Sequence, residues 1–267
     1  MFHGRTMARP LRAVFIDLSG TLHVEDAPVP GASVALARLR EAGAVVRFVT
    51  NTTKESGRSL YERLRRMGFE LHANEMFTSL SAARDVVKVT GVRPLLLLEQ
   101  SALEDFREVD TSRPNAVLVG LAPDKFNSET LNEALRLLME GASLIAVHKA
   151  RYYRRADGLA LGPGPFVEAL TFASGVEPQL VGKPAAAFFQ RVLANVGCEA
   201  HEAVMIGDDV CGDVQGAQDV GIMGFLVQTG KYRTGDETTV DKPPAGTFPD
   251  FPATVEFLLK NFNFGSS

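Results

Sequence analysis

Polar residues stand directly after several apolar runs of the sequence, and their types suit chemistry on an anionic group. They are Asp17 and Ser19 after the first run, Thr50 and Asn51 after the second, Lys183 after a later one, and Asp208 and Asp209 after another. In sheets of parallel strands, ligands bind beyond the carboxyl ends of the strands. We therefore expect these residues to gather at one edge of a sheet, provided that the apolar runs are its strands.

Together these residue types indicate phosphoryl chemistry. Carboxylates at two strand ends suit Mg²⁺, a hard cation that prefers oxygen ligands. A carboxylate also attacks phosphorus and forms an aspartyl-phosphate. A threonine hydroxyl, a lysine ammonium and backbone amides stabilise phosphoryl oxygens as negative charge spreads over them. Gly20, just after the first run, lets the backbone approach such a group closely.

The apolar runs belong to a repeated pattern of strand followed by helix. Buried strands are predicted at 13–18 and 45–49, and each is followed by a helix with apolar residues at helical spacing, at 33–42 and 56–67. This alternation predicts an α/β fold with a doubly wound, Rossmann-like parallel sheet and helices on its faces.

The remainder of the chain continues this alternation, with a proline-rich stretch before the last helix. The predicted strands are 94–98, 116–119, 144–147, 180–181, 203–206 and 225–227, and the predicted helices are 128–139, 166–173, 185–196 and 254–261. Segment 242–252 contains several prolines, which predicts a surface loop.

Composition excludes several classes of protein. The 267 residues carry a net charge of −4, which does not favour a nucleic-acid partner. No apolar run approaches the roughly 20 residues of a membrane-spanning helix, and residues 1–10 do not resemble a secretory signal. Cys198 and Cys211 form neither a zinc-ligand pattern nor a redox motif. We therefore expect a cytoplasmic protein without a membrane or nucleic-acid partner.

Four ordered segments resemble the motifs of the haloacid dehalogenase superfamily of phosphohydrolases. They are AVFIDLSGTL at 13–22, FVTN at 48–51, GKP at 182–184 and VMIGDD at 204–209, followed by Asp213. Their order and strand context match from residue 11 to about residue 260. The resemblance implies a discontinuous Rossmann-like core at 8–84 and 181–262, and an inserted α/β cap of the type-two subgroup at 85–180.

The resemblance also implies a role for each matched residue. Asp17 would be the nucleophile, and Mg²⁺ would be held by the carboxylates of Asp17 and Asp208 and by the backbone carbonyl of Ser19. Thr50 and Lys183 would bind the phosphoryl group of a small phosphorylated substrate, with Gly20 and Asn51 beside them. Asp209 and Asp213 would lie near the cation, and each is as readily a helix cap or a residue behind the ligands as an occasional ligand.

Ser19 departs from the family pattern, which usually has a second aspartate two positions after the nucleophile. That aspartate protonates the leaving oxygen, and such help is worth about 10²–10⁴-fold in rate. We therefore expect substrates whose leaving groups need little protonation, namely acyl phosphates, aryl phosphates, phosphoramidates and pyrophosphate. The alternative is that Ser19 is a neutral replacement and a water takes over this task.

Two other functions use the same residues. One is a catalytically weak member of the fold that binds a phosphorylated ligand or regulates a partner, which Ser19 favours and the otherwise complete set of motif residues opposes. The other is a phosphoacceptor signalling domain, but such domains are shorter and have no cap. Both are less consistent with the sequence than a phosphatase.

Several features of the predicted cap remain open between two interpretations. The basic segment 148–155 follows a predicted strand and is either a solvated face or a surface that faces an anionic substrate. The exposed surface of a cap is compatible with a homodimer, although no coiled-coil pattern or apolar stripe indicates one. His23 and His201 lack a partner pattern, so structural roles are expected for both.

Overall fold

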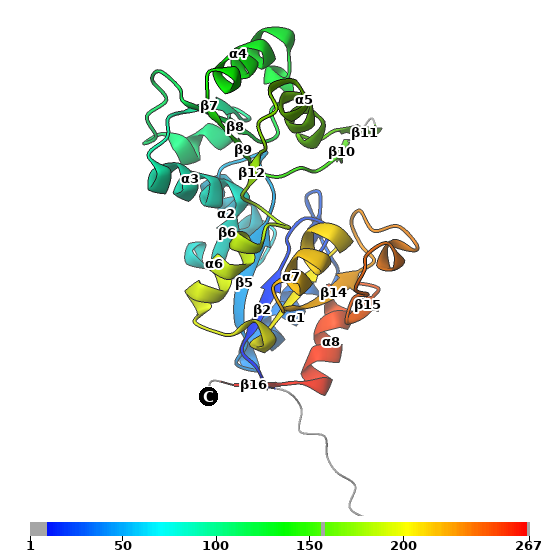
Figure 1. Ribbon diagram of the computed structural model, residues 1–267. Helices are drawn as coiled ribbons and strands as arrows, with labels where there is room; N and C mark the ends of the chain where they lie inside the picture. The colour runs from blue at the N-terminus through cyan, green and yellow to red at the C-terminus, as the bar shows by residue number, and fades with distance from the viewer. Residues whose placement is uncertain (1–9, 156–157, 266–267) are drawn as a thin grey trace, which may run out of the picture. The chain divides into compact units, whose positions relative to one another are not determined.

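The computed structural model describes residues 10–155 and 158–265, which form two compact units (Figure 1). The first unit contains the chain up to Val49, Arg63–Met76 and the chain from Phe189 onward. The second contains Thr50–Glu62 and Phe77–Phe188. Residues 8 and 9, with which the predicted core begins, lie outside the described residues.

The first unit is built on a six-stranded sheet with the order β15-β14-β13-β2-β5-β6, in which the last residue of β5 and the last two of β6 fall in the second unit. Its strands are β2 (Ala13–Ile16), β5 (Val45–Thr50), β6 (Met76–Thr78), β13 (Ala203–Gly207), β14 (Met223–Val227) and β15 (Gly246–Phe248). Neighbouring strands from β15 to β5 are parallel. The chain runs outward from β2 on one side and from β13 on the other, so the strand order reverses between these two central strands. Ligands of open α/β sheets bind at such a reversal.

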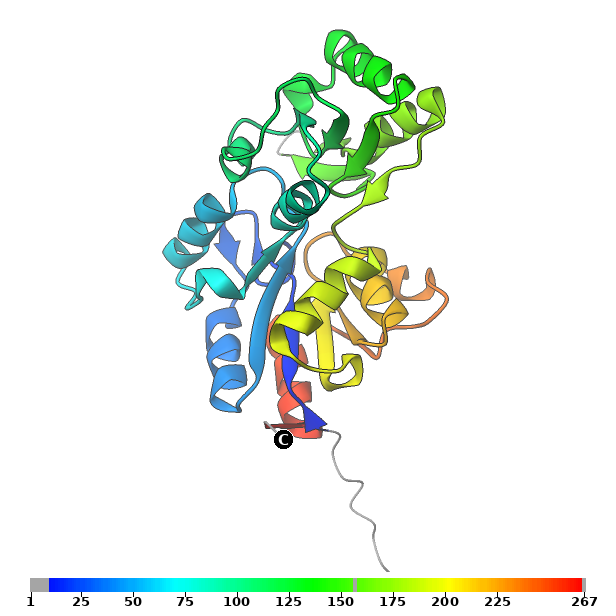
Figure 2. The ribbon, with the colours of Figure 1, turned by 60° about the vertical axis from the view of Figure 1, so that its left-hand side comes forward.

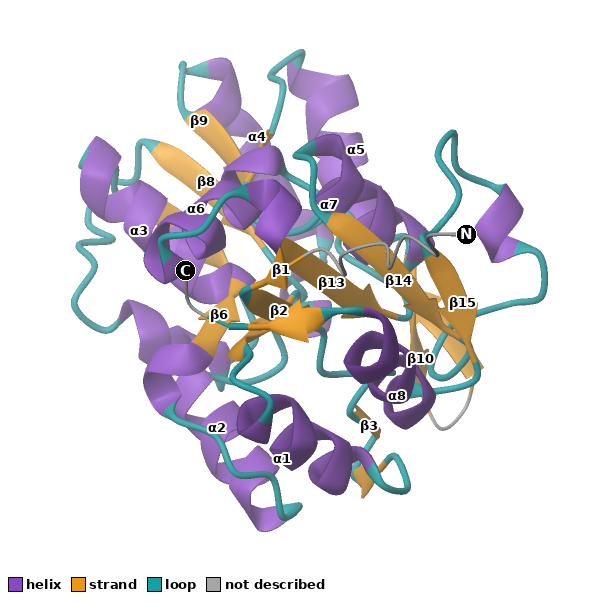
Figure 3. Cartoon of the chain, turned by 90° about the horizontal axis from the view of Figure 1, so that it is seen from below, coloured by secondary structure: helices purple, strands orange, loops and turns teal. Residues whose placement is uncertain are grey.

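Helices cover both faces of this sheet (Figure 3). They are α1 (Ala32–Glu41), α2 (Gly57–Arg66), α6 (Ala186–Val196), α7 (Gly216–Asp219) and α8 (Phe251–Asn261). Helices α1 and α8 pack against each other on one face, and α7 lies on the other. Every residue of β2 and β13 is buried, as expected for central parallel strands covered on both sides.

Two short strand pairs complete the first unit. Strand β1 (Pro10–Leu11) pairs in parallel with β16 (Asn263–Phe264), which joins the two ends of the described chain. Strands β3 (His23–Val24) and β4 (Ala27–Pro28) form an antiparallel hairpin directly after the first motif.

The second unit contains a four-stranded parallel sheet with the order β12-β9-β8-β7 (Figure 2). The strands are β7 (Pro94–Leu97), β8 (Ala116–Val119), β9 (Ser143–Ala146) and β12 (Gln179–Leu180), and the helices are α3 (Ser79–Thr90), α4 (Ser128–Met139) and α5 (Gly164–Ser174). An antiparallel hairpin of β10 (Tyr152–Arg155) and β11 (Gly158–Leu161) follows β9.

Side chains of β8 alternate between two apolar cores in this unit. Val117 and Val119 pack with residues of α4 and α5, whereas Leu118 packs with residues of α3. The strand is therefore buried on both faces, and its continuous apolar sequence follows from that burial.

The predicted α/β fold with a parallel-sheet core is confirmed, and an inserted cap is consistent with the second unit. The predictions of a strand at 116–119 and a helix at 128–139 coincide with β8 and α4. The prediction of a loop throughout 242–252 is wrong, because β15 pairs in parallel with β14. This strand has only three residues and follows two prolines at the edge of the sheet, so it has no periodic pattern to reveal it. The core and cap boundaries stay a prediction.

Across the described ranges 10–155 and 158–265, no helix combines the length and apolar character needed to cross a membrane.

Candidate active site

Asp17 and Asp208 follow the two central strands of the first unit. Ile16 of β2 is paired with Ile206 of β13, and the backbone N–H of Asp17 donates to the carbonyl of Ile206 at 2.9 Å. Both carboxylates are buried, with exposures of 6% and 2%. The parallel register therefore brings the two predicted cation ligands to the point where the strand order reverses.

Asp213 adds a third buried carboxylate to this pair. It lies on a π-helical turn, Val210–Gln215, that follows β13. One oxygen from each of Asp17, Asp208 and Asp213 lies within 4.8 Å of the others. Gathering three like charges out of water is unfavourable unless a cation neutralises them.

The donor set fits Mg²⁺. All three groups offer carboxylate oxygens, the ligands that this ion prefers. The Oδ1 atom of Asp208 is buried and has no hydrogen-bond partner among the described residues. A buried carboxylate oxygen normally has a partner, and a cation would provide one here.

Burial raises the pKa of Asp208 well above its usual value. The positive charge of Lys231 opposes this increase, whereas the charges of Asp17 and Asp213 add to it. Desolvation acts to lower the pKa of Lys231, but the carboxylates of Asp209, Asp208 and Asp213 outweigh it and raise that pKa. Lys231 is therefore a fixed positive charge beside the carboxylates.

Two glycines make room for the carboxylates. A Cβ at Gly20 would lie 2.1 Å from Oδ2 of Asp208, and one at Gly207 would lie 2.1 Å from Oδ2 of Asp213. Gly20 also has a φ of 98°, in the left-handed region that favours glycine. Neither glycine can be replaced by a larger residue unless the carboxylates move.

Asp209 uses its side chain as a cap. Its Oδ1 accepts hydrogen bonds from the backbone N–H groups of Cys211 and Gly212, at 3.1 and 2.9 Å. Its Oδ2 accepts one from Nζ of Lys231 at 2.7 Å. The cap interpretation of Asp209 thus agrees with its contacts, while Asp213 offers the oxygen that faces Asp17 and Asp208.

Ser19 is exposed, and the backbone that follows it is held by a hairpin. The N–H of Gly20 donates to the carbonyl of His23 at 2.7 Å. His23 is buried, with Nδ1 2.7 Å from the carbonyl of Glu25, and burial lowers its pKa. A neutral imidazole that donates from Nδ1 fits this contact, while Nε2 is buried without a hydrogen-bond partner among the described residues. A structural role for His23 stays a prediction.

Thr50, Asn51 and Lys183 belong to the second unit. Thr50 ends β5 and is buried, and its Oγ1 accepts a hydrogen bond from the N–H of Thr52 at 3.1 Å. A hydroxyl that accepts a hydrogen bond in this way can also donate one.

The side chain of Asn51 holds the backbone of Lys183. Its Oδ1 accepts from the N–H of Lys183 at 2.9 Å, and its Nδ2 donates to the carbonyl of Lys183 at 2.8 Å. A Cβ at Gly182 would lie 2.5 Å from this Oδ1, so a glycine must precede the lysine. Asn51 therefore contacts the predicted phosphate-binding lysine directly.

One lysine of the basic segment is paired with an acidic residue. Lys149 forms an ion pair with Glu168, and the ring of Tyr153 lies 4.8 Å from Nζ of Lys54. The side chains of Arg154 and Arg155 lie outside the described part of the structure. Both interpretations of the segment remain predictions.

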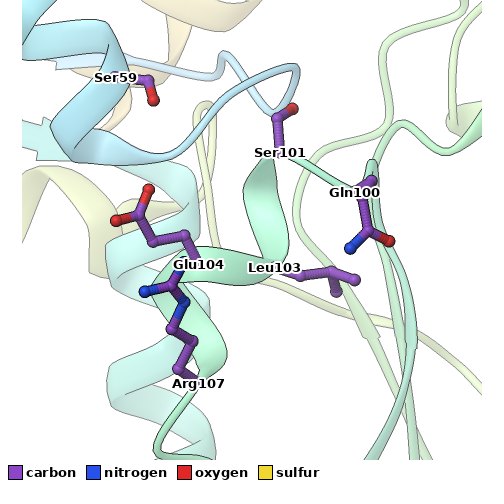
Figure 4. Close-up of a pocket in the computed structure, with 6 residues that line it drawn as sticks. All are labelled: Ser59, Gln100, Ser101, Leu103, Glu104 and Arg107. Atoms are coloured by element: carbon purple, nitrogen blue, oxygen red, sulfur yellow. The ribbon is translucent and has the colours of Figure 1, made fainter.

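One cavity of the second unit does not involve the predicted site residues (Figure 4). It has a volume of about 340 Å³ and is lined by Ser59, Gln100, Ser101, Leu103, Glu104 and Arg107. Glu104 already accepts hydrogen bonds from Ser56 and Arg58, at 2.8 and 2.7 Å. The carboxylate of this cavity is therefore already paired.

Comparison with known proteins identifies the family. Residues 14–112 match the family described as haloacid dehalogenase-like hydrolase, and residues 180–254 match a second model of HAD-hydrolase-like proteins. Human haloacid dehalogenase-like hydrolase domain-containing protein 2 is 56% identical over 253 residues, which cover 95% of this chain and 98% of that protein. The chain belongs to the haloacid dehalogenase-like hydrolases. The resemblance noted in the sequence is thereby confirmed.

Other members of the haloacid dehalogenase-like hydrolases are phosphatases. Human phospholysine phosphohistidine inorganic pyrophosphate phosphatase is 38% identical over 257 residues, covering 94% of this chain and 95% of that protein. A solved p-nitrophenyl phosphatase from Archaeoglobus fulgidus aligns with a TM-score of 0.85 and 27% identity, covering 93% of this chain and 100% of that one. This haloacid dehalogenase-like hydrolase is a phosphohydrolase.

A further similar solved structure is that of glycerol phosphate phosphatase Rv1692 from Mycobacterium tuberculosis, in complex with magnesium. It aligns with a TM-score of 0.80 and 26% identity, covering 91% of this chain and 76% of that one.

The sequence interpretation of this haloacid dehalogenase-like hydrolase missed Thr229 and Lys231. Both follow β14 and are separated from each other only by Gly230. The rule that selected polar residues after the other central strands would have found them if it had been applied to the strand at 225–227 as well.

Proposed function

We propose that this protein is a Mg²⁺-dependent phosphatase that acts on a small phosphorylated substrate through an aspartyl-phosphate on Asp17. The observation that carries the proposal is the group of three buried carboxylates in which Oδ1 of Asp208 has no hydrogen-bond partner among the described residues. The solved relative in complex with magnesium supports the choice of cation.

Asp17, Asp208 and the backbone carbonyl of Ser19 would hold the cation, with Asp213 beside them. Mg²⁺ would neutralise the carboxylates and the charge that develops on the phosphoryl oxygens. A carboxylate oxygen of Asp17 forms a bond to phosphorus, and the bond from phosphorus to the leaving group breaks. Water then attacks phosphorus, which releases inorganic phosphate and restores the Asp17 carboxylate.

Thr50 and Lys183 would stabilise the transferring phosphoryl group by a hydroxyl hydrogen bond and a positive charge. Gly20 would let the backbone approach it. Asn51 would position Lys183, since both hydrogen-bonding groups of its side chain contact the backbone of that residue.

The preferred substrates would have good leaving groups, because the hydroxyl of Ser19 is too weak an acid to protonate a poor one. Acyl phosphates, aryl phosphates, phosphoramidates and pyrophosphate meet this condition. Two relatives support this preference, since their names give p-nitrophenyl phosphate in one case and phospholysine, phosphohistidine and pyrophosphate in the other.

We also propose the division into a core at 8–84 and 181–262 and a cap at 85–180, and a cytoplasmic location. The location is supported by the free thiols of Cys198 and Cys211, which suit a reducing compartment. The second candidate function, a weak or silent phospho-ligand binder, is favoured only by Ser19.

The test is phosphate release from p-nitrophenyl phosphate by the purified protein, with Mg²⁺ and with EDTA. We expect release that requires Mg²⁺ and is lost in the D17N variant. Release that persists in D17N would contradict the nucleophile. An absence of release from p-nitrophenyl phosphate, acetyl phosphate and pyrophosphate would favour the silent binder.

A further inference from the structure

The loop Thr229–Lys231 contacts both the first motif and Asp208, although it belongs to neither motif. The hydroxyl of Thr229 donates a hydrogen bond to the carbonyl of Gly20. Two residues later, the backbone N–H of Lys231 donates to Oδ2 of Asp208 at 2.8 Å. All of these residues lie in the first unit.

Gly230 lies between the two contacting residues, and its backbone approaches both Asp208 and Gly20 closely. A Cβ at this position would lie 2.2 Å from Oδ2 of Asp208 and 2.4 Å from Cα of Gly20. The loop therefore packs against both groups, and only glycine permits this approach.

Hydrogen bonds hold the peptide groups on both sides of Gly20. The N–H of Gly20 donates to the carbonyl of His23, and its own carbonyl accepts from Thr229. In a planar trans peptide the carbonyl of Ser19 points opposite to the N–H of Gly20. The contact to His23 therefore sets the direction of the Ser19 carbonyl. The contact to Thr229 holds the next peptide group, between Gly20 and Thr21, and so limits rotation of the backbone at Gly20.

The contact to Asp208 leaves its two carboxylate oxygens in different environments. Oδ2 is held by Lys231, whereas Oδ1 is buried without a hydrogen-bond partner in the described structure. A carboxylate held through one oxygen presents the other in a fixed direction, as partners behind metal ligands commonly do.

We infer that Thr229, Gly230 and Lys231 form a positioning loop that orients two of the cation ligands, the Ser19 carbonyl and the Asp208 carboxylate. This inference rests on the proposed function, because it takes these two groups as Mg²⁺ ligands. Thr229 is the residue that tests it, since its side chain makes the contact to Gly20.

The experiment is calorimetric titration of Mg²⁺ into the metal-free protein, with T229V, T229S and T238V beside the wild type. Valine keeps the shape of threonine and removes its hydroxyl, so T229V is expected to weaken Mg²⁺ binding about tenfold. T229S keeps the hydroxyl and is expected to bind like the wild type. Thr238 donates in the same way to the carbonyl of Gly235 at 2.7 Å, on an exposed turn, so T238V is the matched control.

Equal Mg²⁺ affinity of T229V and the wild type would overturn the inference, and so would equal weakening by T238V. If T229V does not fold, as judged by circular dichroism, G230A takes its place with the same expected loss. The D208N variant tests the proposed cation site separately from the role of the loop. If D208N binds Mg²⁺ like the wild type, the proposed cation site itself is wrong, whereas a wild-type affinity of T229V alone removes only the role of the loop.

Discussion

Asn51 and Lys183 are 132 positions apart in the sequence and share two hydrogen bonds, in which the Asn51 side chain both donates to and accepts from the Lys183 backbone. The lysine is 97% buried, with an exposure of 3%. The position of a buried lysine ammonium depends on the position of the backbone that carries it. A fixed backbone therefore keeps the ammonium where it can act on a substrate.

We expect N51A to lower kcat/KM for p-nitrophenyl phosphate by about 10–100-fold, since small displacements of a catalytic group have effects of this size. The measurement is steady-state kinetics at saturating Mg²⁺. N132A is the matched control, because Asn132 is exposed on α4 and hydrogen-bonds only to Ser128 among the described residues. Wild-type kinetics of N51A would show that Lys183 does not depend on this contact.

Ser19 is exposed, so a carboxylate fits at this position. We expect S19D to raise kcat/KM for an alkyl ester such as glycerol phosphate by at least about tenfold, because it supplies the missing general acid. The rate on p-nitrophenyl phosphate should change much less, since nitrophenolate leaves without protonation. Rates for both esters are compared with those of S19A. An unchanged preference between the esters would favour a water as the acid.

The raised pKa of Asp208 predicts a cost in stability for the metal-free protein. When the pKa of a carboxyl group is higher in the folded state, the protein becomes less stable as the pH rises from the unfolded-state pKa, here 3.8, through the folded-state pKa. In EDTA at neutral pH, we therefore expect D208N to be more stable by about 1 kcal/mol, which corresponds to roughly 2–4 °C in Tm.

Addition of Mg²⁺ should raise the Tm of the wild type and leave that of D208N nearly unchanged, because a ligand stabilises only the protein that binds it. Differential scanning fluorimetry measures both effects. D241N provides the control for loss of a negative charge at an exposed position. A destabilised D208N that still responds to Mg²⁺ would contradict both expectations.

Away from the site, the lowered pKa of Glu75 predicts a contribution to protein stability that depends on pH. Arg40 donates two hydrogen bonds to its carboxylate, at 2.8 and 2.7 Å, and the N–H of His72 donates a third at 2.8 Å. Burial by itself would raise the pKa of Glu75, but these contacts outweigh it and lower the pKa below its usual value. The stabilisation is thus present above about pH 4.5 and is lost as the pH falls through the folded-state pKa.

We expect E75Q to lower the free energy of unfolding by about 1–2 kcal/mol at pH 7, and by less as the pH falls below 4.5. Urea unfolding at several pH values measures this difference. E62Q is the control, because Glu62 is half exposed and lies 3.7 Å from an exposed arginine, Arg58. A loss for E75Q that is independent of pH would show that charge is not its cause.

The alternation of strands and helices, and through it the α/β class, could be predicted from the sequence alone. Central strands such as β2 and β13 are apolar at every position because both faces are covered, and this burial is visible in the sequence. Asp17 and Asp208 could be selected for a similar reason, since each directly follows such a run and strand ends share an edge in a parallel sheet.

The neighbours of these residues could not be predicted from the sequence and are known only from the folded chain. Whether Asp209 or Asp213 faces the other carboxylates depends on the π-helical turn after β13, and a spacing of four residues does not reveal it. The contact of Thr229 with Gly20 joins positions 209 residues apart, and β15 exists because β14 offers it an edge. Local periodicity reports which face of an element is buried, whereas hydrogen bonds between distant segments form only once the packed elements bring them together.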